Sequence, residues 1–259
     1  MLHRQPVSMG KLYSSGFDML NKEIEQSFLH AEGPGELPIR RTTQQLLGIL
    51  APYGNYRDVG HLCAWAYKEI AESQFPDVFV IIGKGGTEYG FFTSLFSGWK
   101  TPFGIVDVDK EKGQELIKLF PDLKNDYTAF EQGAAIEAQL PFLQFANRDK
   151  LNDVRILPIL VNSLDYPKCQ ALGEAIADLR GNGRICVIGS CTLYGDLVDT
   201  ALVDALKRMD TKKILDIAQV NAARGDIVVF TEALKHLFAR RGRLLHYQPG
   251  AAALSFLLR

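Results

Sequence analysis

The sequence has little net charge: its 29 lysines and arginines nearly balance 30 aspartates and glutamates, which leaves a formal net charge of -1. A protein with this balance has no overall attraction to nucleic acid or to an anionic membrane, so we expect neither as a partner. No apolar run reaches the roughly 18 residues of a membrane span, and the polar N-terminus lacks a signal-peptide core. These absences predict a cytoplasmic protein that is not bound to a membrane.

Residues that ligate metals or form disulfides are also scarce. The four cysteines are Cys63, Cys169, Cys186 and Cys191, and they show no C-x-x-C spacing. Their apolar or helical contexts favour reduced thiols over disulfides. The five histidines are His3, His30, His61, His236 and His246, and no pair has the spacing of metal ligands on a helix or a strand. We therefore interpret each histidine as structural or exposed, and we predict no metal and no cofactor.

What the sequence does contain is an alternation of apolar strands and amphipathic helices. Continuous apolar runs, typical of parallel strands buried on both faces, occur at 46–51, 78–82, 155–161 and 185–189. Helical periodicity occurs at 17–29, 59–73, 110–120, 134–146 and 167–180, and in three segments within 200–240. Short strands at 91–96 and 104–108 around a 99–102 turn, and terminal strands at 244–247 and 252–258, complete the pattern. Since strands alternate with helices of crossover length, we predict a single α/β domain over residues 1–259 with a mostly parallel central sheet.

The clearest passage from strand to helix lies between residues 46 and 73. Pro52 ends the apolar run at 46–51 because it has no N–H to donate to a neighbouring strand. We assign Asp58 as the N-cap of the helix that follows. The apolar face of that helix consists of Leu62, Ala66, Tyr67 and Ile70, with Trp65 toward a different surface. Because open α/β folds keep their sites at the carboxyl edge of the sheet, Tyr53 in this turn is the first candidate site residue.

Three further stretches contain side chains suited to chemistry. Lys84, in the turn Gly83-Lys84-Gly85-Gly86-Thr87, could hold an anion together with the backbone N–H groups, although this is not a Walker A loop. Cys191 follows the strand at 185–189, where a nucleophile would suit, but no histidine lies near it in sequence. Glu137 lies in the apolar stretch 134–142, where a carboxylate needs a partner or a pocket. The structural alternatives are a flexible turn with a solvated lysine, a small buried cysteine, and a glutamate that reaches solvent.

Several segments, taken in order, resemble the Memo family over nearly the whole chain. The segments are Gly10-Lys11-Leu12-Tyr13, Ala51-Pro52-Tyr53-Gly54-Asn55-Tyr56, Trp99-Lys100-Thr101-Pro102-Phe103-Gly104, Ile136-Glu137-Ala138-Gln139-Leu140-Pro141-Phe142-Leu143 and Leu157-Pro158-Ile159-Leu160-Val161. They are similar to the family's A-G-x-x-Y, A-P-H-A-G-Y, W-x-T-P-L-G, [IL]-E-V-Q-L-P-F-L and V-P-I-L-V. The resemblance implies an α/β core with helices on both faces, akin to that of class III extradiol dioxygenases.

The positions that match the family's metal ligands depart from its pattern. The resemblance implies that, in the dioxygenase-like relatives, histidines and an acidic or sulfur ligand hold a metal at the edge of the sheet. The matching positions here are Tyr53, Gly86, Thr87, Ala134, Leu193 and Ala222. A phenolate oxygen can ligate iron, but one tyrosine cannot replace a whole ligand set. We therefore interpret the chain as a divergent member that has lost the metal site.

Two functions are compatible with these departures. The first is a metal-free binding or scaffold protein that acts with a partner enzyme, another protein or a second copy of itself. The second is a metal-independent enzyme on a small anionic substrate, with the candidate catalytic residues Tyr53, Lys84, Glu137 and Cys191. The candidate ligand-binding residues are Tyr53, Lys84, Gly85, Gly86 and Arg224, because lysine and arginine would supply the positive charge that a metal supplies in the relatives. We expect Tyr53 and Lys84 to follow neighbouring strands, so that their side chains converge.

Overall fold

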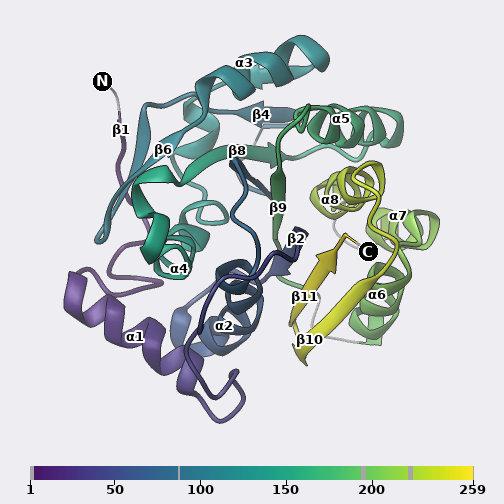
Figure 1. Cartoon of the computed structure of the whole chain (residues 1–259). Coiled ribbons are helices and arrows are strands. Elements are labelled where there is room, and N and C mark those ends of the chain that lie inside the picture. Colours follow the sequence, from purple (N-terminus) through teal and green to yellow (C-terminus); the bar gives the residue numbers. More distant parts are fainter. Residues whose placement is uncertain (1–2, 87, 194–196, 221–223, 259) are drawn as a thin grey trace.

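The computed structural model describes residues 3–86, 88–193, 197–220 and 224–258, and a large mixed sheet lies at its centre (Figure 1). The strands are β1 (His3–Arg4), β2 (Leu46–Ala51), β3 (Val78–Gly83), β4 (Phe91–Thr93), β5 (Gly98–Thr101), β6 (Gly104–Val108), β7 (Leu123–Asn125), β8 (Arg155–Val161), β9 (Ile185–Ser190), β10 (Gly242–Gln248) and β11 (Ala251–Leu257). The α-helices are α1 (Phe17–Leu29), α2 (Tyr56–Glu72), α3 (Lys110–Leu119), α4 (Leu140–Ala146), α5 (Tyr166–Asp178), α6 (Leu197–Arg208), α7 (Thr211–Val220) and α8 (Gly225–His236). Short 3₁₀ helices occur at Thr128–Phe130, Glu137–Gln139 and Arg148–Asp153.

The strand order is β1-β5-β6-β8-β3-β9-β2-β11-β10, with β4 paired to β8 and β7 paired to β4. From β6 through β8, β3 and β9 to β2 the neighbours are all parallel. The hairpin of β10 and β11 then continues the sheet with antiparallel pairing, β11 against β2. The predicted α/β class with a mostly parallel sheet is therefore confirmed.

Helices cover both faces of the sheet, which explains why every residue of β2, β3 and β9 is buried. On one face α8 packs on β3, β8 and β9, and α5 packs on α8. On the other face α2 packs on β2 and β11, and α1 and α4 pack against α2 (Figure 1). A strand between two helical layers has no solvent face, so its sequence is continuously apolar, as the runs at 46–51 and 78–82 are. None of the helices within the described ranges combines the length and apolarity needed to cross a bilayer.

Several boundaries differ from the prediction. The helix predicted to start after an Asp58 cap instead starts at Tyr56, because Asn55 adopts extended backbone and its side chain accepts a hydrogen bond from the backbone N of Arg57. The turn predicted at 99–102 is wrong: those residues belong mostly to β5, and the chain reverses between Thr101 and Gly104, where Gly104 has a φ of 115°. The segment predicted as one helix over 134–146 contains a 3₁₀ turn at Glu137–Gln139. The α-helix α4 starts only at Leu140, and Pro141 lies in its first turn.

The predicted apolar face of α2 is buried, so its central leucine gives a direct test of the packing. Leu62 is 0% exposed, and we expect Leu62→Ala to lower the free energy of unfolding by about 2–5 kcal/mol, since the cavity left behind cannot fully close. Chemical denaturation measures this change. Leu29→Ala is the matched control, because Leu29 at the end of α1 is 58% exposed. Equal midpoints for the two variants would show that the packing face of α2 is wrongly assigned.

Candidate functional site

The carboxyl edge of the parallel sheet brings the ends of β2, β9 and β3 into one row. Ala51 pairs with Ser190, and Ser190 pairs with Gly83. The expectation that Tyr53 and Lys84 follow neighbouring strands is therefore wrong, because β9 lies between β2 and β3. Adjacent strands are about 4.8 Å apart, so β2 and β3 are separated by roughly 10 Å at this edge. The residue that follows the central strand of the three is Cys191.

Residues 134–139 form a cap over this row of strand ends. The Ser190 hydroxyl donates to the carbonyl of Ala135 at 2.6 Å. The Gln139 amide donates to the Ser190 hydroxyl at 2.8 Å and to the Pro52 carbonyl at 3.0 Å. The cap lies so close that a Cβ added at Gly83 would be 2.9 Å from the Cβ of Ala135. Protein therefore covers the ends of β2, β3 and β9 on this side, and Ala134, one of the departures from the family pattern, begins the cap.

Arg224 lies beside the end of β9 and connects it to the start of α8. Its guanidinium donates to Asp226 through two hydrogen bonds, of 2.9 and 2.7 Å. It also donates to the sulfur of Cys191 at 2.9 Å and to the carbonyl of Thr192 at 2.7 Å. Arg224 and Asp226 are 8% and 2% exposed, so this is a buried ion pair. A positive charge that belongs to the protein thus lies between the thiol and the carboxylate.

Tyr53 is half-buried beside the same group of residues. Burial raises its pKa, with Asp226 and Cys191 acting in the same direction, while the Arg224 cation and a hydrogen bond with the Thr192 side chain lower it. The phenol is therefore neutral near pH 7 and able to donate a hydrogen bond. Of the candidates from the sequence, the structure brings together Tyr53, Cys191 and Arg224. It adds Thr192 and Asp226, which the sequence analysis did not single out.

The thiol of Cys191 is buried, and burial raises its pKa to about 12 even though Arg224 opposes the shift. A thiol with a raised pKa remains protonated at neutral and mildly alkaline pH, and the thiolate is the nucleophile. The other cysteines are also free and buried, as the sequence predicts. Cys191 therefore has the properties of a structural residue.

We expect the folded protein to resist alkylation by iodoacetamide at pH values where free cysteine, with its pKa of about 8.5, reacts readily. All four thiols should react with iodoacetamide once the protein is unfolded in concentrated guanidinium chloride. In the native state all four should remain unmodified, because each is buried. Mass spectrometry after timed alkylation measures this. Rapid and selective labelling of Cys191 in the native protein would contradict the structural role and favour the enzyme hypothesis.

The turn with Lys84 is held by a side chain from the end of β8. The backbone N–H of Gly85 donates to the Asn162 side-chain oxygen at 3.1 Å, and the amide of Asn162 donates in return to the carbonyls of Gly85 and Glu88. The N–H of Gly85, expected to face an anion, is therefore already used within the protein. Lys84 itself is partly exposed. Thr87 lies outside the described residues.

Glu137 binds the N-terminal segment of the chain. Its carboxylate pairs with Arg4, which is 5% exposed, while Glu137 itself is 0% exposed. It accepts hydrogen bonds from the backbone N–H groups of Val7 at 2.9 Å and Ser8 at 2.8 Å, and from the Tyr13 hydroxyl at 2.7 Å. Every acceptor position of the carboxylate thus has a donor within the chain. The partner that the sequence analysis required for Glu137 is this segment.

Comparison of this chain with known protein families identifies the family to which it belongs. A family model described as Memo-like protein matches residues 4–255. The chain belongs to the Memo family. The resemblance drawn from the segments around Tyr53, Trp99 and Glu137 is thereby confirmed, together with the dioxygenase-like fold class that it implied.

Relatives within the Memo family are similar along most of their length. A MEMO1 family protein of Methanobrevibacter smithii is 32% identical over 233 residues, which cover 84% of this chain and 81% of that protein. A MEMO1 family protein of Methanocaldococcus jannaschii is 30% identical over 261 residues, which cover 94% and 91%. A crystal structure of an uncharacterized protein from Escherichia coli K12 superimposes with a TM-score of 0.55 at 14% identity, covering 77% of this chain and 92% of that one. This last likeness concerns the fold alone.

The side chains at the carboxyl edge do not fit the transition metal that the family resemblance implies. Among the described positions that match family ligands, Tyr53 is a phenol with a raised pKa, and Leu193 is a buried apolar side chain. The other donors nearby, the Cys191 thiol and the Asp226 carboxylate, are both bound to the Arg224 guanidinium. A dication would have to displace this cation, and the thiol would have to lose its proton. Ala222 lies outside the described residues.

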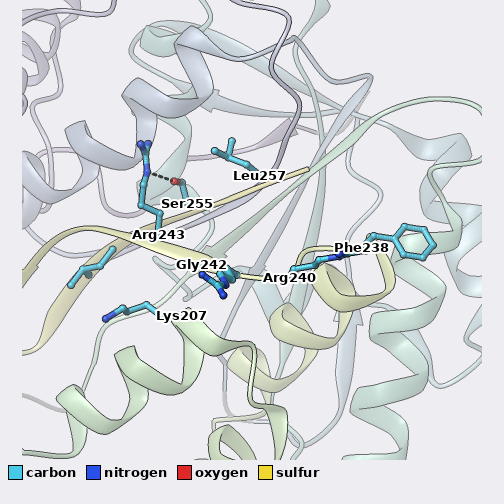
Figure 2. Close-up of a pocket in the computed structure, with 9 residues that line it drawn as sticks. Lys207, Phe238, Arg240, Gly242, Arg243, Ser255 and Leu257 are labelled. Carbon is cyan, nitrogen blue, oxygen red and sulfur yellow. Dashed lines mark hydrogen bonds between the residues drawn. The ribbon is translucent and has the colours of Figure 1, made fainter. Parts of the chain in front are cut away.

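A basic pocket of about 470 Å³ lies at the opposite edge of the sheet, where β10 begins and β11 ends (Figure 2). Its cationic lining consists of Lys207, Arg240, Arg241 and Arg243. Arg243 pairs with Glu69 and donates to the Ser255 hydroxyl, whereas Arg240 and Arg241 form no ion pair with any described residue. None of the described residues that line the pocket is acidic. The pocket is a second place where an anion could bind.

Three of the histidines, separated in sequence, meet where α2 packs against the end of α1 and against β10. The rings of His30 and His61 stack with centroids 4.9 Å apart, and the ring of His246 contacts His61 edge-on at 5.9 Å. Burial lowers the pKa of His61, and the neighbouring His30 adds to the shift. The spacing of histidines in the sequence gave no sign of this cluster, because it forms only when α1, α2 and β10 pack together.

Proposed function

We propose that this chain is a cytoplasmic binding or scaffold protein of the Memo family that holds no metal at the Tyr53 edge, and that it acts together with a partner enzyme or with a second copy of itself. The observation that carries the proposal is the Arg224 guanidinium, which binds Cys191 and Asp226 at the edge where the family resemblance implies a metal. A guanidinium at the carboxyl edge of the sheet suits this edge to ligand binding, whereas Lewis-acid chemistry would need a metal ion there.

The placement of the other candidates favours this function over the metal-independent enzyme. Glu137 is bound to the N-terminal segment, and Cys191 is a protonated, buried thiol. A nucleophile is activated by an adjacent base or by a depressed pKa. The pKa of Cys191 is raised, and its side-chain partner among the described residues is the Arg224 cation. The cap at 134–139 adds a packed surface in front of the strand ends. The groups at this edge that suit a ligand are the Tyr53 hydroxyl, as a hydrogen-bond donor, and the positive charge of Lys84.

The ligand class that suits these groups is a small carboxylate or phosphate. Phosphate and citrate are therefore the probes for a thermal-shift titration of the wild-type protein, Lys84→Ala, and the double variant Arg240→Ala/Arg241→Ala. Binding to the folded state raises the melting temperature with ligand concentration. Stabilisation that disappears in Lys84→Ala supports binding at the Tyr53 edge, and stabilisation that disappears only in the arginine variant assigns the anion to the basic pocket. Flat titrations for all three proteins would remove the anionic ligand from the proposal.

The loss of the family's metal is tested separately by elemental analysis of the purified protein. We expect that no transition metal is bound through the Tyr53 edge, so that Tyr53→Phe leaves the metal content unchanged. A stoichiometric metal, on the order of one per chain, that disappears in Tyr53→Phe would overturn the proposed function. The variant isolates this edge, because it removes the oxygen ligand and keeps the aromatic ring.

A further inference from the structure

The histidine cluster between α1, α2 and β10 includes a carboxylate. Glu32 follows the end of α1, His61 lies in the second turn of α2, and His246 lies in β10. One ligand atom from each of these three side chains lies within 4.8 Å of the other two. The Nε2 atom of His61 is 3.7 Å from a carboxylate oxygen of Glu32. These elements are adjacent because α2 packs against both α1 and β10.

The structure assigns a further site to this cluster: we propose that Glu32, His61 and His246 bind a divalent ion of the Zn²⁺ class. Two imidazole nitrogens and one carboxylate oxygen form a common protein ligand set for zinc, with solvent in the fourth position. The site is separate from the carboxyl edge with Tyr53 and does not rest on the proposed function. It also uses none of the positions that match the family's ligands.

The distances are close to those that an ion requires. With zinc–ligand bonds of about 2.0–2.2 Å, the ligand atoms of a tetrahedral site lie roughly 3.4 Å apart. The 3.7 Å separation of His61 and Glu32 already approaches this value. All three ligand atoms lie within 4.8 Å of one another, and Glu32 is exposed, so its side chain has room to rotate toward the two imidazoles.

The surroundings restrict the two imidazoles and leave the carboxylate accessible. The indole of Trp65 stacks on the ring of His246 with centroids 6.4 Å apart, and its Nε1 donates to the carbonyl of Glu32 at 2.9 Å. His30 stacks on His61 from the other side. The side-chain oxygen of Gln248 lies 3.0 Å from Nε2 of His61. An ion that binds this nitrogen takes the place of the proton in this contact, and the neutral imidazole then carries its proton on Nδ1. The indole contacts limit how His246 and the Glu32 backbone can move.

Isothermal titration of the metal-stripped protein with zinc chloride tests the site. We expect one zinc ion per chain and an affinity at least about tenfold lower in each of Glu32→Gln, His61→Ala and His246→Ala, because loss of a ligand exceeds the effect of losing an outer-shell partner. Glu32→Gln is the variant least able to disturb folding, since the side chain is exposed. His236→Ala, a histidine in the last turn of α8 outside the cluster, is the matched control and should bind as the wild type does.

Circular dichroism of each variant confirms that the fold is retained. Wild-type protein that takes up no zinc, or variants that all bind it with unchanged affinity, would overturn the proposal. A loss of affinity in His236→Ala equal to that in His246→Ala would do the same, because zinc binding would then not depend on the cluster. Zinc that is lost in Tyr53→Phe and retained in all three cluster variants would contradict both this site and the proposed absence of a metal at the Tyr53 edge.

Discussion

Replacing Glu137 with alanine is expected to lower the free energy of unfolding by about 3–5 kcal/mol, which is the usual effect of breaking a buried ion pair. The side chain is 0% exposed and accepts bonds from Arg4, two backbone N–H groups and the Tyr13 hydroxyl. Without it, the Arg4 cation keeps carbonyl partners at Gln5, Phe130 and Gly133 and its position over the Trp99 ring, at 4.4 Å, but has no anionic partner among the described residues. An uncompensated charge in a buried position then favours release of the N-terminal segment.

Urea denaturation of Glu137→Ala beside Glu131→Ala measures this effect. Glu131 is exposed and lies in the same segment of the chain, so its removal should change stability by less than about 0.5 kcal/mol. The double variant Arg4→Met/Glu137→Gln should be less destabilised than the sum of its single variants, because no unpaired charge remains. A Glu137→Ala protein as stable as Glu131→Ala would show that the carboxylate does not hold the segment in place.

The second large effect is expected for Arg224→Met, again about 3–5 kcal/mol of lost stability. This change leaves the carboxylate of Asp226, which is 2% exposed, without its two charge-assisted hydrogen bonds. It also removes the donors to the Cys191 sulfur and the Thr192 carbonyl. The position of Asp226 in the first turn of α8 compensates only in part, because the helix dipole is a weaker partner than a guanidinium.

Arg240→Met is the matched control, since Arg240 is exposed and forms no ion pair with a described residue. The double variant Arg224→Met/Asp226→Leu should recover much of the stability lost in Arg224→Met, because a buried pair replaced by apolar groups is often neutral. Thermal and chemical denaturation both report the difference. If the double variant is less stable than Arg224→Met, the ion pair is not the source of the effect.

The elements with strong periodicity were predictable, and the order of the strands was not. The bounds of α1 and β2 agree with the sequence prediction residue for residue, because a 3.6-residue stripe and an unbroken apolar run are local signals. That β9 lies between β2 and β3 depends on which strands pair, and apolar runs of equal length contain no such information. For this reason the prediction that Tyr53 and Lys84 follow neighbouring strands was wrong.

The candidate site was predictable in part for the same reason. Tyr53, Cys191 and Arg224 were found because each follows or precedes a regular element or matches a family position. Asp226 was missed, although a carboxylate two residues after an arginine in a first helical turn is a usable sign of an ion pair. The contact of Glu32 with His61 and His246 could not have been read from spacing, because it joins three elements that only tertiary packing brings together.

The pairing of β2 also has a consequence for how the chain reaches its native state. This strand, Leu46–Ala51, has as its two neighbours β9 and β11, which begin at Ile185 and Ala251. Closing loops of this length before any pairing is gained makes folding slow, because the entropy is lost before the contacts compensate for it. During synthesis at about 5–20 residues per second, β2 therefore remains an unpaired apolar edge for several seconds after it is made. We therefore expect β2 to gain both of its neighbours only after β9 and the hairpin of β10 and β11 have been synthesised.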